Sequence, residues 1–325
     1  MKALRHIKLV FFCLVSCTEG DPEAFPAGER PGGRVTVNFG LETPSVKGYF
    51  SGEEDAVHSL ALLVFRSSDG GLDARAHNEA SNSITADVTE GEKMDWFIVA
   101  NAPDGVLTSF RNEQEFLSSF CTLGQGMTMF SSGSRTFSEE SHSVSALLNR
   151  YACKVSMESI RVDWPGALPC LLEKVALLNA VGSCPWSGIP DSGGIWYNCS
   201  AVDADGYIRQ MLVWEDGADI DTDEDAPVGA ELYAMPNPST GKDYGLPWTP
   251  RCTRLAIELK SGGVSNWYSV DLPAMNCNCH YLVRNVVIKG PGTPEPDQEL
   301  VRNGIACEIS VLPWGTEETD VEFAS

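Results

Sequence analysis

The sequence predicts an all-β protein built from two β-sandwich domains in tandem. Short apolar runs recur along the chain, several with the two-residue alternation of a half-buried strand. The 30 glycines and 19 prolines are scattered among these runs, where a chain of many strands needs its turns. At 325 residues the chain exceeds one typical domain, so two domains are expected.

The first 17 residues have the features of a lipoprotein signal peptide. A start with three positive charges is followed by the short apolar stretch 9–15. This order is typical of a secretory signal that is removed after export. The residues at 14–17 are Leu-Val-Ser-Cys and match the bacterial lipobox, so Cys17 is the predicted lipidation site. The alternative is an ordinary signal peptide in which Cys17 is incidental.

A tether and a first strand follow the signal peptide. Residues 18–34 are polar and rich in Pro and Gly, which predicts a flexible link between the lipid and the folded part. In the next segment apolar side chains alternate with small or polar ones, as in a half-buried strand. Its apolar residues are Val35, Val37, Phe39 and Leu41.

The remaining elements are mostly short strands. The run 60–65 is apolar on both faces, as in a strand that is covered on both sides. One good helical pattern lies at 112–122, and the turn-forming segment 183–194 is the candidate junction between domains at 35–188 and 189–325. Further strands are predicted at 83–88, 96–100, 152–157, 174–178, 231–235, 254–259, 267–272, 281–288 and 306–312.

Charge argues against one class of partner, and the lengths of the apolar runs argue against a membrane-spanning helix. The net charge of −22 argues against nucleic acid, because a polyanionic surface loses the counterion release that drives such binding. No apolar run reaches the roughly 18–20 residues that a membrane-spanning helix needs. The 11 cysteines are less informative: after removal of the signal and lipidation of Cys17, nine remain. Disulfides and small buried side chains are both open for these nine, and no pairing can be deduced.

Several segments, in their order and spacing over nearly the whole chain, resemble the fimbrillin family. This family comprises the type V pilins and the associated tip and anchor proteins of Bacteroidales-type bacteria. The segments are the lipobox, the strand 35–41, the run 60–65, Phe-Ile-Val-Ala-Asn-Ala at 97–102, Asn-Arg-Tyr-Ala-Cys-Lys-Val at 149–155, Glu-Leu-Tyr-Ala-Met-Pro-Asn-Pro-Ser at 231–239, His-Tyr-Leu-Val-Arg-Asn-Val-Val-Ile-Lys-Gly-Pro-Gly-Thr at 280–293 and Val-Leu-Pro-Trp at 311–314.

The resemblance implies two transthyretin-like β-sandwiches and a structural role in place of an enzymatic one. It implies a subunit of a cell-surface pilus (fimbrium) that is exported as a lipoprotein to the outer membrane and supports adhesion. The expected partners are other pilus subunits and outer-membrane lipid, the latter through Cys17. The resemblance implies no cofactor.

The resemblance also implies assembly by strand exchange. In stalk members a protease cuts after a basic residue in the loop that follows the first strand. That strand, here Val35, Val37, Phe39 and Leu41, then leaves a groove for a neighbour's strand. The candidate cleavage point is Lys47, before Gly48. Stalk pilins usually have Arg there, so cleavage by a trypsin-like protease and an uncut anchor or tip subunit both stay open.

The C-terminal tail is the candidate donor strand. Residues 317–325 offer Val321 and Phe323 on one face, as a strand that fills an apolar groove requires. The alternative is a frayed or self-paired end.

Other chemistry has weak support in the sequence. The segment 277–280, Cys-Asn-Cys-His, lacks a second ligand pair for zinc, and the acidic run 219–225 lacks the glycine and glutamate of a calcium loop. We therefore predict no catalytic, cofactor-binding or metal-binding residue. The alternative function is a lipid-anchored surface glycan-binding lipoprotein, whose eight Trp and eight Tyr would form a sugar platform. The competing interpretation of these aromatic residues is sandwich core.

Overall fold

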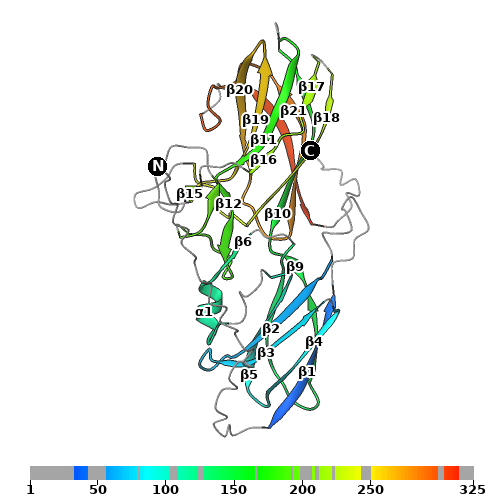
Figure 1. The fold of residues 1–325 in the computed structure, drawn as a ribbon, viewed down its shortest axis with the longest axis vertical. Helices are drawn as coiled ribbons and strands as arrows, with labels where there is room; N and C mark the ends of the chain where they lie inside the picture. The colour runs from blue at the N-terminus through cyan, green and yellow to red at the C-terminus, as the bar shows by residue number, and fades with distance from the viewer. Residues whose placement is uncertain are drawn as a thin grey trace, which may run out of the picture. The chain divides into compact units, whose positions relative to one another are not determined.

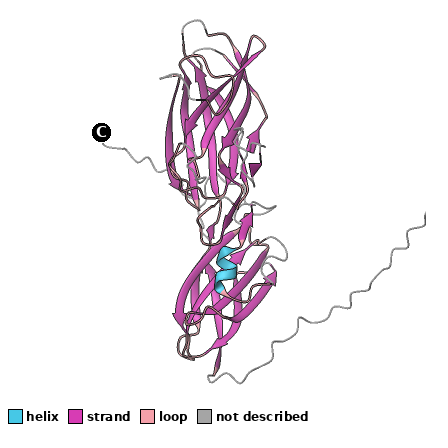
Figure 2. Cartoon of the chain, turned by 90° about the vertical axis from the view of Figure 1, so that its left-hand side faces the viewer, coloured by secondary structure: helices cyan, strands magenta, loops and turns pink. Residues whose placement is uncertain are grey.

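The structure is a computed structural model, and its described residues form 22 strands and one short helix (Figures 1 and 2). The all-β prediction is confirmed. Within this part of the chain, no helix is long and apolar enough to cross a bilayer. The described residues are 33–42, 56–79, 81–102, 109–122, 127–164, 167–191, 193–197, 207–208, 212–221, 224–242, 250–298 and 304–314.

Two sheets form the first sandwich. The smaller has the order β4-β1-β8 and the larger the order β3-β2-β5-β7-β9. A cluster of buried apolar side chains from both sheets lies between them. The strands are β1 (Arg34–Glu42), β2 (Ser59–Arg66), β3 (Leu72–Glu79), β4 (Ser83–Thr89), β5 (Lys93–Ala100), β7 (Met129–Thr136), β8 (Ser143–Leu147) and β9 (Asn149–Arg150).

The larger sheet of the first sandwich is covered on its outer face as well. On β2, Leu62 contributes to the cluster between the sheets, whereas Leu63 and Phe65 belong to a second buried cluster. Phe116 from the helix α1 (Glu113–Ser118) packs into this second cluster. The prediction that 60–65 is covered on both sides is therefore confirmed.

Short strands complete this outer cover. Two of them form a ribbon of their own, and three others form a small sheet. Both pieces supply side chains to the second cluster, among them Cys121, Cys184 and Trp196. The ribbon is β6 (Phe120–Thr122) with β13 (Ser183–Pro185), and the small sheet is β12 (Ala180–Val181), β14 (Trp196–Tyr197) and β15 (Tyr207–Ile208).

The helix is shorter than the predicted 112–122. The side chain of Asn112 accepts a hydrogen bond from Glu115 N–H and so caps the first turn. Ser119 has extended backbone angles and ends the helix. Residues 120–122 pair with β13 in place of continuing the helix, because that ladder satisfies their backbone groups.

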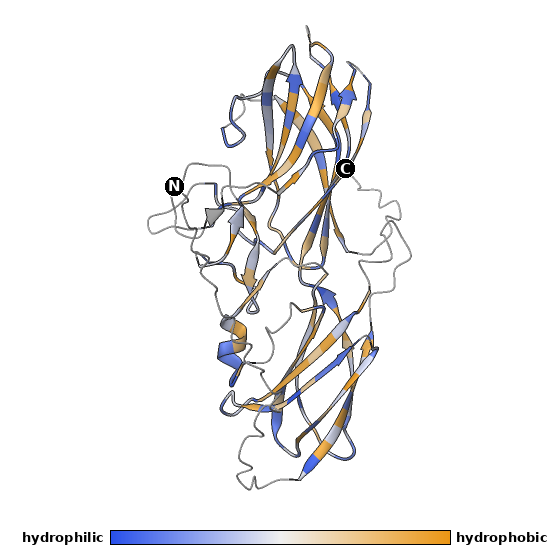
Figure 3. Cartoon of the chain, viewed as in Figure 1, coloured by the Kyte–Doolittle hydropathy of each residue, from blue (hydrophilic) through white to orange (hydrophobic). Residues whose placement is uncertain are grey.

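A second pair of sheets forms the second sandwich. One has the order β18-β10-β21-β22, and the other the order β16-β11-β19-β20 with β17 paired to β11. One apolar core cluster draws on both sheets, and apolar residues recur along their strands (Figure 3). The strands are β10 (Cys153–Val162), β11 (Cys170–Leu178), β16 (Leu212–Trp214), β17 (Ala218–Ile220), β18 (Ala226–Ala234), β19 (Arg254–Ser261), β20 (Val264–Asp271), β21 (Cys279–Ile288) and β22 (Ile305–Pro313).

The chain passes between the two sets of sheets earlier than residue 188. β10 and β11 precede the predicted boundary, yet their partners are β16–β19 and β21, all of which follow it. Residues 183–186 pair with β6 and its flank, and they pack into the cover of the first sandwich instead. Because sheet partners define a domain better than turn content does, we propose a boundary between β9 and β10.

Candidate strand-exchange site

The first strand, β1, is the middle strand of its sheet. It pairs with β4 in antiparallel register from Arg34↔Thr89 to Gly40↔Ser83. On its other edge it pairs with β8 in parallel register from Asn38↔Ser143 onward. A strand with partners on both edges leaves a slot, not an edge, when it is withdrawn, and the slot is lined by two rows of backbone hydrogen-bonding groups.

One face of β1 lies in the core of the first sandwich. Val35 is 7% exposed, and Val37 and Phe39 are fully buried. The residues between them are exposed, which is the predicted alternation. Leu41 departs from this pattern because it is only partly buried. The strand is therefore held mainly by its first three apolar side chains.

Phe39 is the largest of these side chains. Its ring lies 5.5 Å from the ring of Trp96 on β5 and 6.0 Å from that of Phe137, between ring centroids. The buried side chains of Ile84 on β4 and Val144 on β8 flank it in register. Full burial of a Phe or Val side chain is worth about 1.5–3 kcal/mol, so a slot without β1 has a large apolar surface to cover.

Residues on the exposed face of β1 make polar contacts with β4 and β3 that stabilise the strand less than its buried side chains do. Thr36 Oγ1 donates to Asp87 Oδ1 at 2.6 Å. The guanidinium of Arg34 bonds the Asp87 carbonyl and lies 3.8 Å from the buried carboxylate of Asp73. Thr36 and Arg34 are both exposed, so these contacts contribute roughly 0–1 kcal/mol each, although the Asp73 carboxylate itself is buried. The strand is therefore held in place by its alternating apolar side chains and its backbone more than by its outer residues.

Sequence reasoning missed two parts of this site. The strand β8 was not predicted, although Val144 and Ala146 alternate with serines in it. Phe137 lies outside every predicted strand and nevertheless packs on Phe39. The alternation in β8 was a usable signal, whereas nothing in the sequence pointed to Phe137.

The other predicted site residues lie outside the described part of the chain. They are the lipidation residue Cys17, the cleavage residues Lys47 and Gly48, and the donor-strand residues Val321 and Phe323. Their roles remain proposals.

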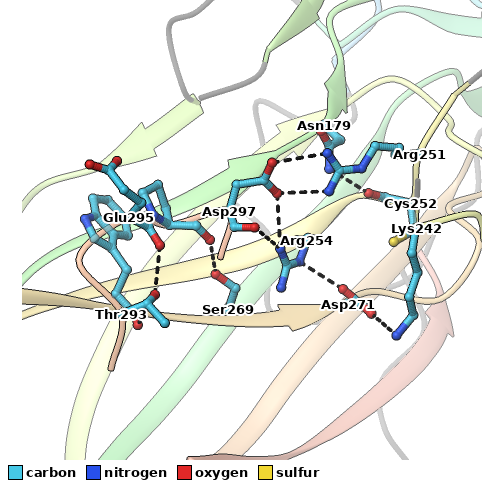
Figure 4. A network of polar contacts seen from close by, with 12 residues as sticks. Asn179, Lys242, Arg251, Cys252, Arg254, Ser269, Asp271, Thr293, Glu295 and Asp297 are labelled. Carbon is cyan, nitrogen blue, oxygen red and sulfur yellow. Dashed lines mark hydrogen bonds and ion pairs between the residues drawn. The ribbon is translucent and has the colours of Figure 1, made fainter. Parts of the chain in front are cut away.

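A polar network in the second sandwich is a separate cluster of charged groups (Figure 4). The Asp297 carboxylate accepts two hydrogen bonds of 3.1 Å from Arg251 and a third from Arg254. Arg254 also pairs with Asp271, which Lys242 contacts at 2.8 Å. Each carboxylate lies between two cationic side chains, and these contacts tie Asp297 to the sheet that contains β19 and β20.

The pKa of Asp271 shows the effect of this network. Burial raises the pKa of Asp271, but the hydrogen bond from Lys242 and the charges of Arg254 and Lys242 outweigh burial. The pKa therefore lies below its ordinary value. Such a carboxylate is ionised at neutral pH and serves as a structural anion.

Metal binding has no support in the described ranges, where no three His, Cys, Asp or Glu side chains gather in a way that could hold an ion. His280, from the Cys-Asn-Cys-His segment, contacts the hydroxyl of Ser156 at 2.6 Å through Nε2.

The aromatic side chains in this part of the chain pack mostly into the cores. Five tryptophans are at most 7% exposed, and three tyrosines at most 5%. A buried ring cannot stack on a sugar in solution, so these residues give no platform for a glycan. They are Trp96, Trp186, Trp196, Trp267, Trp314, Tyr151, Tyr268 and Tyr281.

Solved structures share this architecture over nearly the whole chain. A candidate cell adhesion protein from Bacteroides eggerthii DSM 20697 matches with a TM-score of 0.66 and 16% identity, over 88% of this chain and 97% of that one. A fimbrilin (FimA) from Porphyromonas gingivalis W83 matches with a TM-score of 0.64 and 14% identity, over 86% and 97%. The chain has the fimbrillin fold. At the level of sequence, no protein-family model and no curated protein matches it.

The fimbrillin fold extends to a protein named as a pilus tip. The tip fimbrial protein Mfa3 from Porphyromonas gingivalis, with a C-terminal truncation, matches with a TM-score of 0.52 and 17% identity, over 87% of this chain and all of that one. The TM-scores of these three matches establish a common fold. The family resemblance found in the sequence is therefore confirmed at the level of structure, including the two β-sandwiches.

Proposed function

We propose that this chain is a structural subunit of a cell-surface pilus and not an enzyme. The supporting observation is the fimbrillin fold over nearly the full chain, shared with a FimA fimbrilin and a tip fimbrial protein. A structural role also fits two sandwiches whose buried side chains are predominantly apolar. The expected location is the outer membrane and the surface fimbrium, and we expect the pilus to support adhesion.

Export as a lipoprotein is the first part of the proposal. The lipobox that ends at Cys17 supports attachment of lipid there, and the lipid would hold the subunit at the outer membrane. The partners are then membrane lipid through Cys17 and other pilus subunits through the sandwiches.

Assembly by strand exchange is the second part. Cleavage between Lys47 and Gly48 would release β1, and a neighbour's strand would occupy the slot between β4 and β8. The buried face of Val35, Val37 and Phe39 supports this, because an incoming strand with the same alternation can cover that surface and complete both ladders. Val321 and Phe323 are the side chains that we expect the donor to place there.

N-terminal sequencing of protein recovered from the cell surface tests the processing step. A start at Gly48 is expected for a processed, polymerising subunit. A blocked, lipidated Cys17 would instead identify an anchor or an unprocessed precursor, and cleavage would not belong to the function.

Deletion of residues 316–325 tests the donor strand. We expect the truncated subunit to reach the surface and to form no polymers, because the slot of its neighbour stays unfilled. Polymers of normal length from the truncated chain would contradict the proposal for Val321 and Phe323.

A further inference from the structure

Two cysteines face each other across the ribbon β6–β13. The antiparallel register places Cys121 opposite Cys184, between the pairs Thr122↔Ser183 and Phe120↔Pro185. The ladder continues beyond the ribbon, where Trp186 N–H donates to the Ser119 carbonyl at 3.1 Å. In the structure both cysteines are free thiols.

The register and the ladder pattern together bring this pair within reach of a covalent bond. The hydrogen bond between residues 186 and 119 makes 121 and 184, two residues along, a hydrogen-bonded pair, in which Cα atoms lie about 5.5 Å apart, and disulfides span about 4.4–6.8 Å. The ribbon is three residue pairs long. A short two-stranded ribbon can adjust its twist more freely than a wide sheet can, and so bring the two sulfurs together.

Both thiols are buried in the outer cover of the first sandwich. Cys121 is 1% exposed and Cys184 is fully buried, in the cluster that holds Phe116 and Trp186. Burial raises the pKa of each thiol to about 12. Because the thiolate is the reactive form, exchange at this site must occur before the cover closes. Once formed, the bond is shielded from reductants in the folded protein.

The pair connects parts of the chain that are far apart in sequence. β6 precedes β7 of the first sandwich, whereas β13 follows β10 and β11, which belong to the second. The chain between them leaves the first sandwich at β9–β10 and returns to its cover after β11. A bond between β6 and β13 would therefore close a loop that contains β10 and β11, and would fix the returning segment to the cover of the first sandwich.

We propose that Cys121 and Cys184 form a disulfide in the exported protein. The two thiols lose two protons and two electrons as the S–S bond forms. A low-molecular-weight or protein disulfide accepts the electrons and protons by thiol–disulfide exchange and is reduced to two thiols. The inference rests on the proposed export, because an oxidising compartment supplies such disulfides.

Peptide mapping tests the bond directly. Protein recovered from the cell surface is denatured with iodoacetamide present, digested without reduction and analysed by mass spectrometry. We expect one cross-linked pair of peptides that contains Cys121 and Cys184 and disappears after reduction in denaturant. Alkylation of both cysteines, or a bond from Cys184 to another cysteine such as Cys277, overturns the proposal.

A refolded sample separates this proposal from the proposed function. The purified chain is unfolded, reduced and refolded with reduced and oxidised glutathione, then mapped in the same way. The bond in both samples supports the disulfide, and its absence from the surface sample contradicts the disulfide and leaves the pilus function standing. A chain that forms the bond on refolding but is absent from the cell surface contradicts the pilus function and leaves the pairing of the two cysteines supported.

Alanine variants give a second measurement. Cys121→Ala, Cys184→Ala and the double variant should each lower Tm by a similar amount, roughly 5–10 °C, because each loses the same bond. A double variant whose loss equals the sum of the two single losses would contradict the proposal. The control is Cys170→Ala on β11, whose register partner is Ile220, and it should keep the cross-linked peptide.

Discussion

At the scale of single residues, the packing of β1 into the first sandwich depends most on Phe39. The ring is fully buried between Trp96 and Phe137, whereas the neighbouring Asn38 is exposed on the same strand. Phe39→Ala should lower the free energy of unfolding of the first sandwich by about 3–5 kcal/mol, because it leaves a cavity in the core. Asn38→Ala should change it by about 0.5 kcal/mol or less. Urea unfolding checks both.

Equal effects from these two variants would mean that β1 is not packed in the register described.

The alternation of Val35, Val37 and Phe39 was predictable from the sequence, because a period of two residues is a local property of a strand. The neighbours of Phe39 were not, since Trp96 and Phe137 meet it only through the pairing of distant strands.

A second residue-scale prediction concerns the ion pairs of Asp271. Its pKa is lowered in the folded protein, so its contribution to stability is complete above the unfolded pKa of about 3.9 and is lost as pH falls through the folded value. Thermal unfolding from about pH 6 to pH 2 should therefore show a steeper loss of Tm for the wild type than for Asp271→Asn. The exposed Asp221 lies outside the network, and Asp221→Asn should retain the steep wild-type profile. Parallel profiles for wild type and Asp271→Asn would contradict the role given to these ion pairs.

At the scale of elements, the most apolar strands were the predictable ones. β2, β5, β11 and β19 are rich in Val, Ile, Leu and Phe and were all predicted. β3 (Leu-Asp-Ala-Arg-Ala-His-Asn-Glu) and β7 (Met-Phe-Ser-Ser-Gly-Ser-Arg-Thr) were missed. Their polar sequences form strands because β2 and β5 offer them a ladder, which is a tertiary effect that local propensity does not contain.

A glycine in β7 controls the packing of β5 against β1. Gly133 stands opposite Trp96, and a Cβ added there would lie 2.6 Å from Trp96 Cζ2. Gly133→Ala should therefore displace the ring from Phe39 and lower the free energy of unfolding by about 1–3 kcal/mol. The matched control is Gly229→Ala in β18, where an added Cβ meets nothing within 4 Å.

The control should leave stability unchanged or raise it by about 0.5–1 kcal/mol, because alanine is less flexible than glycine in the unfolded chain. Denaturant unfolding measures both variants. A loss in Gly229→Ala as large as that in Gly133→Ala would show that the contact with Trp96 is not the cause.

At the scale of the whole molecule, the route of the chain was the least predictable feature. The turn-rich segment 183–194 is the domain junction that composition predicts, but β13 at its start covers the first sandwich after β10 and β11 have joined the second. Composition shows where a chain turns, and it does not show which sheet a turn packs against. The same return brings Cys184 to Cys121, which is why no pairing of the cysteines could be predicted from the sequence.

The central claim is that β1 leaves its place when subunits assemble. Thr36 and Asp87 are directly opposed on the exposed face of β1 and β4, and their side chains are in contact. The double variant Thr36→Cys/Asp87→Cys can therefore lock β1 in place through a disulfide, which the single variant Thr36→Cys cannot do. The measurement is the length distribution of the assembled polymer, with and without dithiothreitol. The account predicts no polymer from the oxidised double variant, polymer after reduction, and polymer from the wild type and the single variant in both conditions. Normal polymers from the oxidised, locked subunit would contradict it.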